Sequence, residues 1–145
     1  SFEFIDTDAL IESEAGLRVS EIFSCQGEPA FRDLESKVGM QLASRSGLVI
    51  STGGGFVLRP ENFALLKSHA LVVCLWATAE TLYERVRNQD HRPLLRDPDP
   101  LGRIRKLLME REPVYRQADV LVNTEQRSVR ELAQHIAHEF RSCAR

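Results

Sequence analysis

The sequence predicts an α/β fold, a three-layer arrangement with helices on both faces of a mostly parallel β-sheet. Strand-like and helix-like segments alternate along the chain, which favours parallel strands joined by helical crossovers. Two strand-like runs, residues 48–51 and 71–76, are nearly continuously apolar, as expected for strands buried on both faces. A length of 145 residues with 43% hydrophobic content fits a single domain, residues 1–145.

Four β-like runs are the expected strands, and they comprise residues 2–5, 48–51, 71–76 and 120–123. The expected helices lie between and after them, over residues 28–45, 60–67, 79–88, 101–112 and about 128–142. Apolar residues recur at helical spacing in the first of these helices. Pro60 suits the first turn of the second, and Thr78 is a suitable cap for the third.

The segment NQDHRPLLRDPDP, residues 88–100, interrupts this alternation. It holds three prolines, three aspartates and two arginines between two expected helices. A long, polar, proline-broken connection in a compact domain is often a functional lid. We therefore expect residues 88–100 to form a lid.

The composition excludes several classes of partner. A formal net charge of −2 gives no indication of nucleic-acid binding. The longest apolar stretch, residues 70–77, is far shorter than the roughly 20 residues that span a membrane. The three widely spaced cysteines favour a reducing compartment over a disulfide framework. We expect a cytoplasmic monomer whose partners are small molecules.

Two carboxylates follow the first expected strand in the stretch FIDTD. Ligands of open α/β sheets bind beyond the carboxyl ends of strands, where Asp6 and Asp8 would lie. Residues two apart in a strand share a face, so both side chains could face one cleft. There they could hold a hydrated Mg²⁺ or accept hydrogen bonds from substrate hydroxyls. Alternatively, Asp8 caps a helix that begins at Ala9, and Asp6 is only solvated.

Three consecutive glycines, Gly53, Gly54 and Gly55, end the expected strand 48–51. Glycine continues a strand poorly, because it gives up more backbone entropy on folding and offers no side chain to pack. Exposed N–H groups at this position could form a nest for an anion. A simple turn is the alternative.

Arginines are the remaining candidates, because their planar fork matches carboxylate and phosphate oxygens two at a time. Arg32 and Glu35 lie one helical turn apart, so the glutamate could fix the direction of the guanidinium. Arg92 lies in the expected lid, and Arg111 lies close to Pro113, which would end or distort its helix. Any one arginine taken alone is more often structural than functional.

Five motifs in order along the chain together resemble the shikimate kinase family, a nucleoside-monophosphate-kinase-like P-loop group. They are DTD at 6–8, FRDLE at 31–35, STGGG at 51–55, RPLL at 92–95 and REPVY at 111–115. The resemblance implies a sheet order of 2-3-1-4-5. It also implies transfer of the γ-phosphoryl group of ATP, with Mg²⁺, to the 3-hydroxyl of shikimate in aromatic amino-acid biosynthesis. Gly39 departs slightly from the family, which usually has an aliphatic residue there.

The resemblance also implies roles for individual residues. Asp8 would bind substrate hydroxyls and orient or deprotonate the attacking one, and Asp6 would hold Mg²⁺ through water. Arg32 and Arg111 would bind the shikimate carboxylate, with Glu35 supporting Arg32. Gly53, Gly54 and Gly55 would contact the substrate. Arg92 would stabilise charge on the transferred phosphoryl group, and Arg85 would stack against adenine. Phosphoryl transfer depends mainly on positioning and electrostatic stabilisation, so cationic clamps and a closing lid suit it.

One family motif has no match in the 145 residues, namely the ATP-cradling loop GxxxxGK[ST]. In the family this loop follows a central strand and lies upstream of a strand like residues 2–5. We therefore expect this sequence to be the C-terminal portion of a longer kinase, with residues 48–51 and 71–76 flanking the missing central strand. The alternative is a protein without a P-loop whose sheet is closed in another way. The 145 residues alone are expected not to phosphorylate shikimate. ADP release dependent on shikimate would contradict that expectation.

Two other hypotheses remain open. The chain could be a kinase-like module that senses a small cyclic carboxylate, or another small-molecule kinase of the same group. The combination of DTD, a lid arginine and RxPxY favours an enzyme, because a sensor would not need magnesium-binding and lid residues together. The pair of FRxxE and the triple glycine favours shikimate kinase over its relatives.

Overall fold

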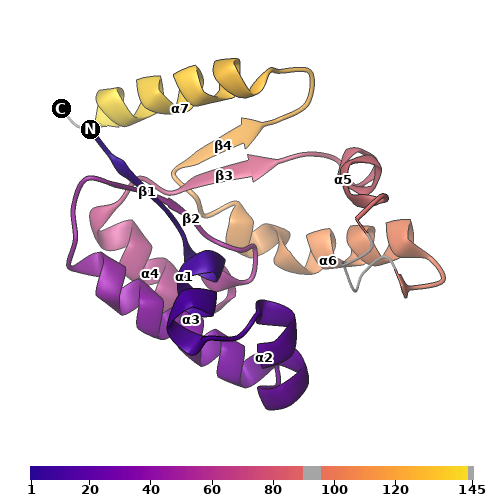
Figure 1. Cartoon of the computed structure of the whole chain (residues 1–145). Helices are drawn as coiled ribbons and strands as arrows, with labels where there is room; N and C mark the ends of the chain where they lie inside the picture. The colour runs from indigo at the N-terminus through magenta and orange to yellow at the C-terminus, as the bar shows by residue number, and fades with distance from the viewer. Residues whose placement is uncertain (90–95, 144–145) are drawn as a thin grey trace. The chain divides into compact units, whose positions relative to one another are not determined.

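The computed structural model describes residues 1–89 and 96–143, and it confirms the predicted α/β class with parallel strands (Figure 1). The chain divides into two compact units, Ser1–Ala70 (unit 1) and Leu71–Arg145 (unit 2). Among the described residues, each unit has its own two-stranded parallel sheet. No helix in the described part is both long and apolar enough to cross a membrane.

Unit 1 contains two strands, four α-helices and one short 3₁₀ helix. In chain order these are β1 (Glu3–Asp6), α1 (Thr7–Ala15), α2 (Val19–Gln26), α3 (Glu28–Ala43), β2 (Leu48–Ser51), η1 (Phe56–Leu58) and α4 (Pro60–His69). The expected strand at 48–51 and the expected helices at 28–45 and 60–67 are confirmed. Helices α2 and η1 were not predicted.

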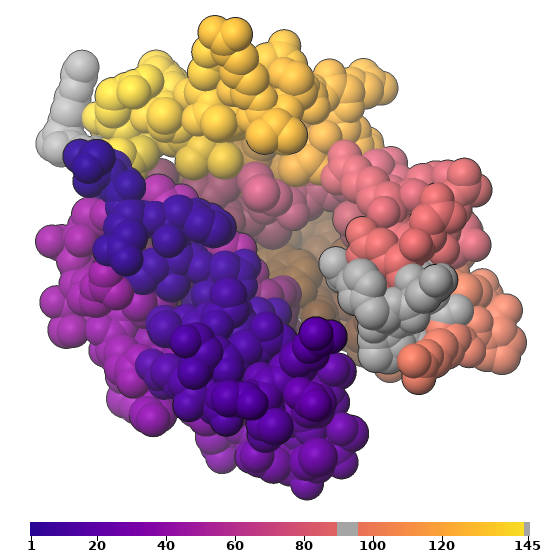
Figure 2. Space-filling model, viewed as in Figure 1, coloured from indigo at the N-terminus to yellow at the C-terminus, as the bar shows by residue number. Residues whose placement is uncertain are grey.

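The sheet of unit 1 is covered by helices on one face. Ile5 pairs with Ile50, and both pack against a core built from α1, α2 and α3. The buried members of that core are Ile11, Ile22, Phe31, Val38 and Leu42. Figure 2 shows the indigo and purple segments of these helices lying against one another, in agreement with the contacts of α1 and α2 with α3.

The other face of this sheet corrects one prediction. Phe4 pairs with Val49, and their side chains are 67% and 53% exposed. The expectation that residues 48–51 form a strand buried on both faces is therefore wrong for the described structure. Successive side chains of a strand point to opposite faces, so a sheet with its core on one side buries only alternate residues.

The start of α1 corrects a second prediction. The Asp6 carboxylate caps this helix, and its Oδ1 accepts hydrogen bonds from the backbone N–H groups of Asp8 (3.0 Å) and Ala9 (3.1 Å). The alternative that Asp8 is the cap is wrong, and Asp8 is not a strand residue. Because β1 ends at Asp6 and α1 begins at Thr7, Asp6 occupies the N-cap position, directly before the first helical residue.

Unit 2 contains β3 (Val73–Trp76), α5 (Ala79–Val86), α6 (Pro100–Tyr115), β4 (Val120–Asn123) and α7 (Val129–Cys143). Strands β3 and β4 pair in parallel, with Val73 opposite Val120. Thr78 caps α5 as predicted, since its Oγ1 accepts from the N–H of Thr81 at 3.4 Å. Leu75 is 56% exposed, so the strand expected at 71–76 is also not buried on both faces.

Helix α6 continues through Pro113 and ends at Tyr115, so the expectation that the helix stops at 112 is wrong. Proline removes a single N–H donor from a helix, and the following backbone can close the turn again. Here the N–H of Arg116 donates to the carbonyl of Glu112 at 2.9 Å.

The strand pairs agree with part of the expected order. In an order of 2-3-1-4-5, the first two strands of this chain are neighbours and so are the last two, as in β1–β2 and β3–β4. The complete five-strand order stays a prediction.

Candidate functional site

Asp8 lies in the first turn of α1, directly after the carboxyl end of β1. Its Oδ1 is buried and accepts no hydrogen bond from the described residues. A Cβ atom placed on Gly53, which follows β2, would lie 3.6 Å from this oxygen and 3.9 Å from Oε1 of Glu35. The carboxyl ends of β1 and β2, together with α3, therefore bring Asp8, Gly53 and Glu35 close to one another.

Burial raises the pKa of Asp8, and the neighbouring Asp6 and Glu12 carboxylates raise it further. The Arg32 guanidinium opposes this shift. A buried acceptor without a donor is unfavourable, so this oxygen is prepared to accept a hydrogen bond from a hydroxyl group. A carboxylate with a raised pKa is also a better proton acceptor than an ordinary one.

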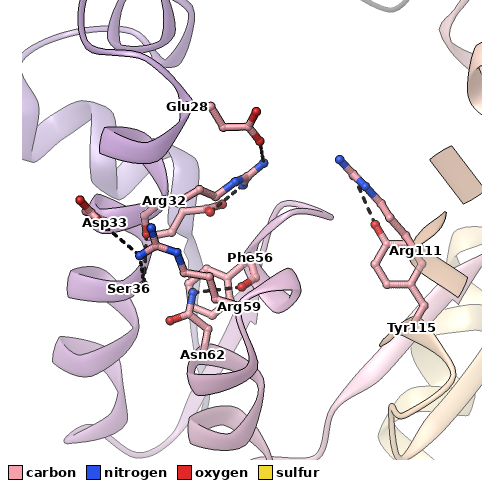
Figure 3. A network of polar contacts seen from close by, with 10 residues as sticks. Glu28, Arg32, Asp33, Ser36, Phe56, Arg59, Asn62, Arg111 and Tyr115 are labelled. Atoms are coloured by element: carbon pink, nitrogen blue, oxygen red, sulfur yellow. Dashed lines mark hydrogen bonds and ion pairs between the residues drawn. The ribbon is translucent and has the colours of Figure 1, made fainter. Parts of the chain in front are cut away.

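The Arg32 side chain is held by two glutamates of its own helix, α3 (Figure 3). Its Nη1 donates to Oε2 of Glu35 at 2.6 Å, and its Nη2 donates to Oε1 of Glu28 at 3.0 Å. Glu35 is 1% exposed, and burial raises its pKa against the opposing effect of Arg32. The predicted Arg32–Glu35 pair is therefore present, and the guanidinium has a fixed direction.

Glu28 was missed by the sequence reasoning, although a signal existed. It lies four residues before Arg32, and side chains at that spacing meet on one face of a helix. Because Glu28 is much more exposed than Glu35, it contributes less to the fixed direction of Arg32.

The glycine loop, Gly53–Gly55, packs against Arg32. A Cβ atom on Gly55 would overlap the Arg32 guanidinium. Gly55 has φ −86° and ψ −16°, an ordinary conformation for any residue. Space beside the guanidinium, and not backbone freedom, is therefore what requires glycine at position 55.

Replacing Gly55 by alanine tests this contact. The added methyl group should displace the guanidinium and weaken its ion pair with buried Glu35, so the free energy of unfolding should fall by about 1–3 kcal/mol. We expect the NMR signal of the Arg32 Nε–H group to shift in Gly55→Ala. It should shift much less in Gly53→Ala, whose Cβ meets its neighbours at ordinary contact distances. Equal shifts in the two variants would contradict the proposed contact.

Asp6, the predicted magnesium ligand, uses Oδ1 to cap α1. Among the described residues, no group of three or more His, Cys, Asp or Glu side chains could enclose a metal ion. Mg²⁺ commonly keeps several waters and binds through one or two carboxylates, so Asp6 and the nearby Asp8 still fit a water-mediated ion. Burial and, after it, the charge of Asp6 raise the pKa of Asp8, and a cation would relieve the repulsion between the two carboxylates.

Two other predicted residues lie in unit 2. The Nη1 of Arg111 donates to the Tyr115 hydroxyl at 3.5 Å, one turn further along α6 (Figure 3). Arg85 on α5 donates to the side-chain and main-chain oxygens of Thr124 at 2.8 and 3.0 Å. Arg85 therefore ties α5 to the segment after β4 in this structure. Arg92 lies outside the described residues, together with the rest of residues 90–95 of the expected lid.

The segment after β4 is fixed by a carboxylate that sequence reasoning missed. Oε1 of Glu125 accepts from the backbone N–H of Thr78 (2.9 Å) and from the hydroxyls of Thr78 and Thr81 (both 2.7 Å). These hydrogen bonds lower the pKa of Glu125 to about 2. The partners are 44 and 47 residues away, so no local pattern indicates the contact.

Comparison with known proteins identifies the class of protein to which this chain belongs. The structure matches that of a shikimate kinase from Acinetobacter baumannii in complex with shikimate, with a TM-score of 0.90 and 37% identity. The match covers 97% of this chain and 79% of that one. The class is the ATP-dependent small-molecule kinases, which are transferases.

A family model described as shikimate kinase matches residues 1–141. A shikimate kinase of Thermodesulfovibrio yellowstonii is 40% identical over 139 residues, and one of a Synechococcus species is 49% identical over 120 residues. These matches cover 96% and 82% of this chain. They span 80% and 63% of the relatives' own lengths. The chain belongs to the shikimate kinase family, which acts in aromatic amino-acid biosynthesis.

Proposed function

We propose that unit 1 recognises shikimate and presents its 3-hydroxyl for phosphorylation by ATP. The observation that carries this proposal is the buried, unpartnered Oδ1 of Asp8 beside an arginine held in direction by Glu35. An acceptor for hydroxyl groups and a clamp for a carboxylate thus occur together. A hydroxylated cyclic acid carries both matching groups, and the A. baumannii relative is described in complex with shikimate.

In this proposal, Asp8 accepts a hydrogen bond from the attacking hydroxyl and helps to orient or deprotonate it. Arg32 binds the carboxylate, with Glu35 as its support. Gly53, Gly54 and Gly55 leave room for the substrate, since a side chain at position 55 would displace Arg32. Each role is electrostatic or positional, as phosphoryl transfer requires.

The remaining roles rest on the family motifs. We propose Arg111 as a second carboxylate-binding arginine, Arg92 as a stabiliser of the transferred phosphoryl group, and Arg85 as the adenine contact. Mg²⁺ would be held through water by Asp6, and it would supply charge stabilisation on the phosphate oxygens. The proposed partners are shikimate and ATP, bound by a monomer.

The finer architecture is also a proposal. We propose that β1–β2 and β3–β4 are the outer pairs of a sheet of order 2-3-1-4-5 in one kinase domain, with residues 88–100 as its lid. The parallel register of both pairs and the exposed apolar side chains of β1, β2 and β3 support this arrangement.

Titration calorimetry with three ligands tests the proposal. Shikimate should bind. Its methyl ester should bind roughly 10- to 100-fold more weakly, because a charge-assisted hydrogen bond contributes about 1.5–3 kcal/mol. 3-Dehydroshikimate, which has no 3-hydroxyl group to donate, should also bind more weakly. Equal binding of all three compounds, or no binding of shikimate, would overturn the proposed recognition.

A further inference from the structure

Phe56 is the residue that follows the glycine loop, and its side chain is 1% exposed. It opens η1, and this short helix contacts both α3 and α4. The glycine loop therefore runs directly into a buried aromatic residue, so the position of the ring determines where the loop ends.

The ring of Phe56 lies in a notch on α3 that exists because residue 39 is glycine. A Cβ atom on Gly39 would lie 2.9 Å from Cζ of Phe56, closer than real Cβ contacts. Gly39 follows Arg32 and Glu35 at intervals of seven and four residues, so all three belong to one face of the helix. The notch is thus on the same helical face as the arginine clamp.

A hydrogen bond fixes the main chain at the same point. Nδ2 of Asn62, a residue 2% exposed, donates to the carbonyl oxygen of Phe56 at 3.0 Å (Figure 3). This bond ties Phe56 to α4, whereas Arg59, which follows η1, contacts α3 through Asp33 at 2.8 Å and Ser36 Oγ at 3.2 Å. The start of η1 is therefore held by the notch on α3 and by α4, and the residue after its end is held by α3.

We propose that Phe56, seated in the Gly39 notch and bonded by Asn62, is a positioning residue that sets the distance between the glycine loop and Arg32. The inference rests on the proposed function, because it assigns Phe56 to the shikimate carboxylate clamp. Gly55 lies against the guanidinium on one side, and on the other the buried ring of Phe56, the next residue, limits its movement away. Phe56 acts through the loop and touches no reacting group.

Enlarging the side chain at position 39 and shortening the one at position 56 tests the inference. Gly39→Ala pushes the ring outward, so the Kd for shikimate should rise about fivefold or more, as expected when contacting residues are coupled. Leucine lacks the ring atoms that reach the notch. Gly39→Ala/Phe56→Leu should therefore bind shikimate more tightly than Gly39→Ala, to within about threefold of the wild type.

Phe63→Leu is the matched control, since Phe63 is also a buried phenylalanine of unit 1. It should lower Tm without changing the Kd for shikimate. An unchanged Kd in Gly39→Ala, or a double variant that binds no better than this single variant, would overturn the inference. So would a Kd in Phe63→Leu that rises as much as in Gly39→Ala, because the effect would then be general loosening of the core.

The NMR amide signals of Gly53, Gly54 and Gly55 provide a readout that needs no ligand. They should shift in Gly39→Ala and return toward the wild-type positions in the double variant. If the wild type binds no shikimate, the proposed function is wrong. The glycine signals then still test whether Phe56 positions the loop. Unchanged signals in Gly39→Ala would overturn it.

Discussion

Replacing Arg32 by alanine is expected to lower both shikimate affinity and stability, for two separate reasons. Affinity should fall roughly 10- to 100-fold, because a charge-assisted bond to the carboxylate is lost. The free energy of unfolding should fall by about 3 kcal/mol or more, because Glu35, 1% exposed, is left as a buried charge without its arginine.

The stability loss in Arg32→Ala should depend on pH. Burial already raises the pKa of Glu35, and removal of Arg32 raises it further. A carboxyl group with a raised pKa in the folded state binds protons more tightly than in the unfolded state, so the free energy of unfolding falls as pH rises. The loss should be small near the ordinary pKa of 4.5 and complete above the raised value.

The double variant Arg32→Ala/Glu35→Ala separates the two effects. It should recover much of the stability, since no buried charge remains, and none of the shikimate affinity. Denaturant unfolding at several pH values and calorimetric titration with shikimate measure the two quantities. Recovery of affinity in the double variant would rule out Arg32 as the carboxylate ligand.

Replacing Asp8 by asparagine is expected to change stability and binding in opposite directions. Burial and the Asp6 and Glu12 charges raise the pKa of Asp8, so its ionised form destabilises the folded state above the ordinary pKa of 3.8. The neutral amide removes that penalty, and we expect a gain on the order of 0.5–2 kcal/mol near neutral pH. The gain should disappear as pH falls below that ordinary pKa.

Shikimate affinity should fall roughly 10- to 100-fold in Asp8→Asn, because the hydroxyl loses a charged acceptor. Glu14→Gln is a suitable comparison, since Glu14 lies on α1 like Asp8 but is exposed. It should leave shikimate affinity unchanged. An Asp8→Asn protein that is less stable than the wild type and binds shikimate normally would show that Asp8 has only a structural role.

The parts of the fold that the sequence predicted are those set by local pattern. The bounds of β2 and β4 agree with the apolar runs at 48–51 and 120–123. The Arg32–Glu35 contact follows from the spacing of one helical turn. Such features depend on residues close together in the chain, so the pattern carries enough information.

The missed features depend on residues far apart or on single buried positions. Helix α2 buries only Ile22, so it shows no clear periodicity. Gly39 and Phe56 are separated along the chain, and nothing near either residue indicates that they touch. The choice between Asp6 and Asp8 as the cap depended on where β1 ends, and element ends are the least predictable part of a pattern.

Only one of the two carboxylate oxygens of Asp6 takes part in the cap of α1. Oδ1 of Asp6 is committed to the helix, so only Oδ2 remains to face a cation or its water shell. Asparagine caps helices about as well as aspartate, so the helix needs an oxygen here more than it needs a negative charge. A neutral amide at position 6 would therefore keep the cap and remove only the charge, so the cap and the proposed magnesium role of Asp6 can be tested separately.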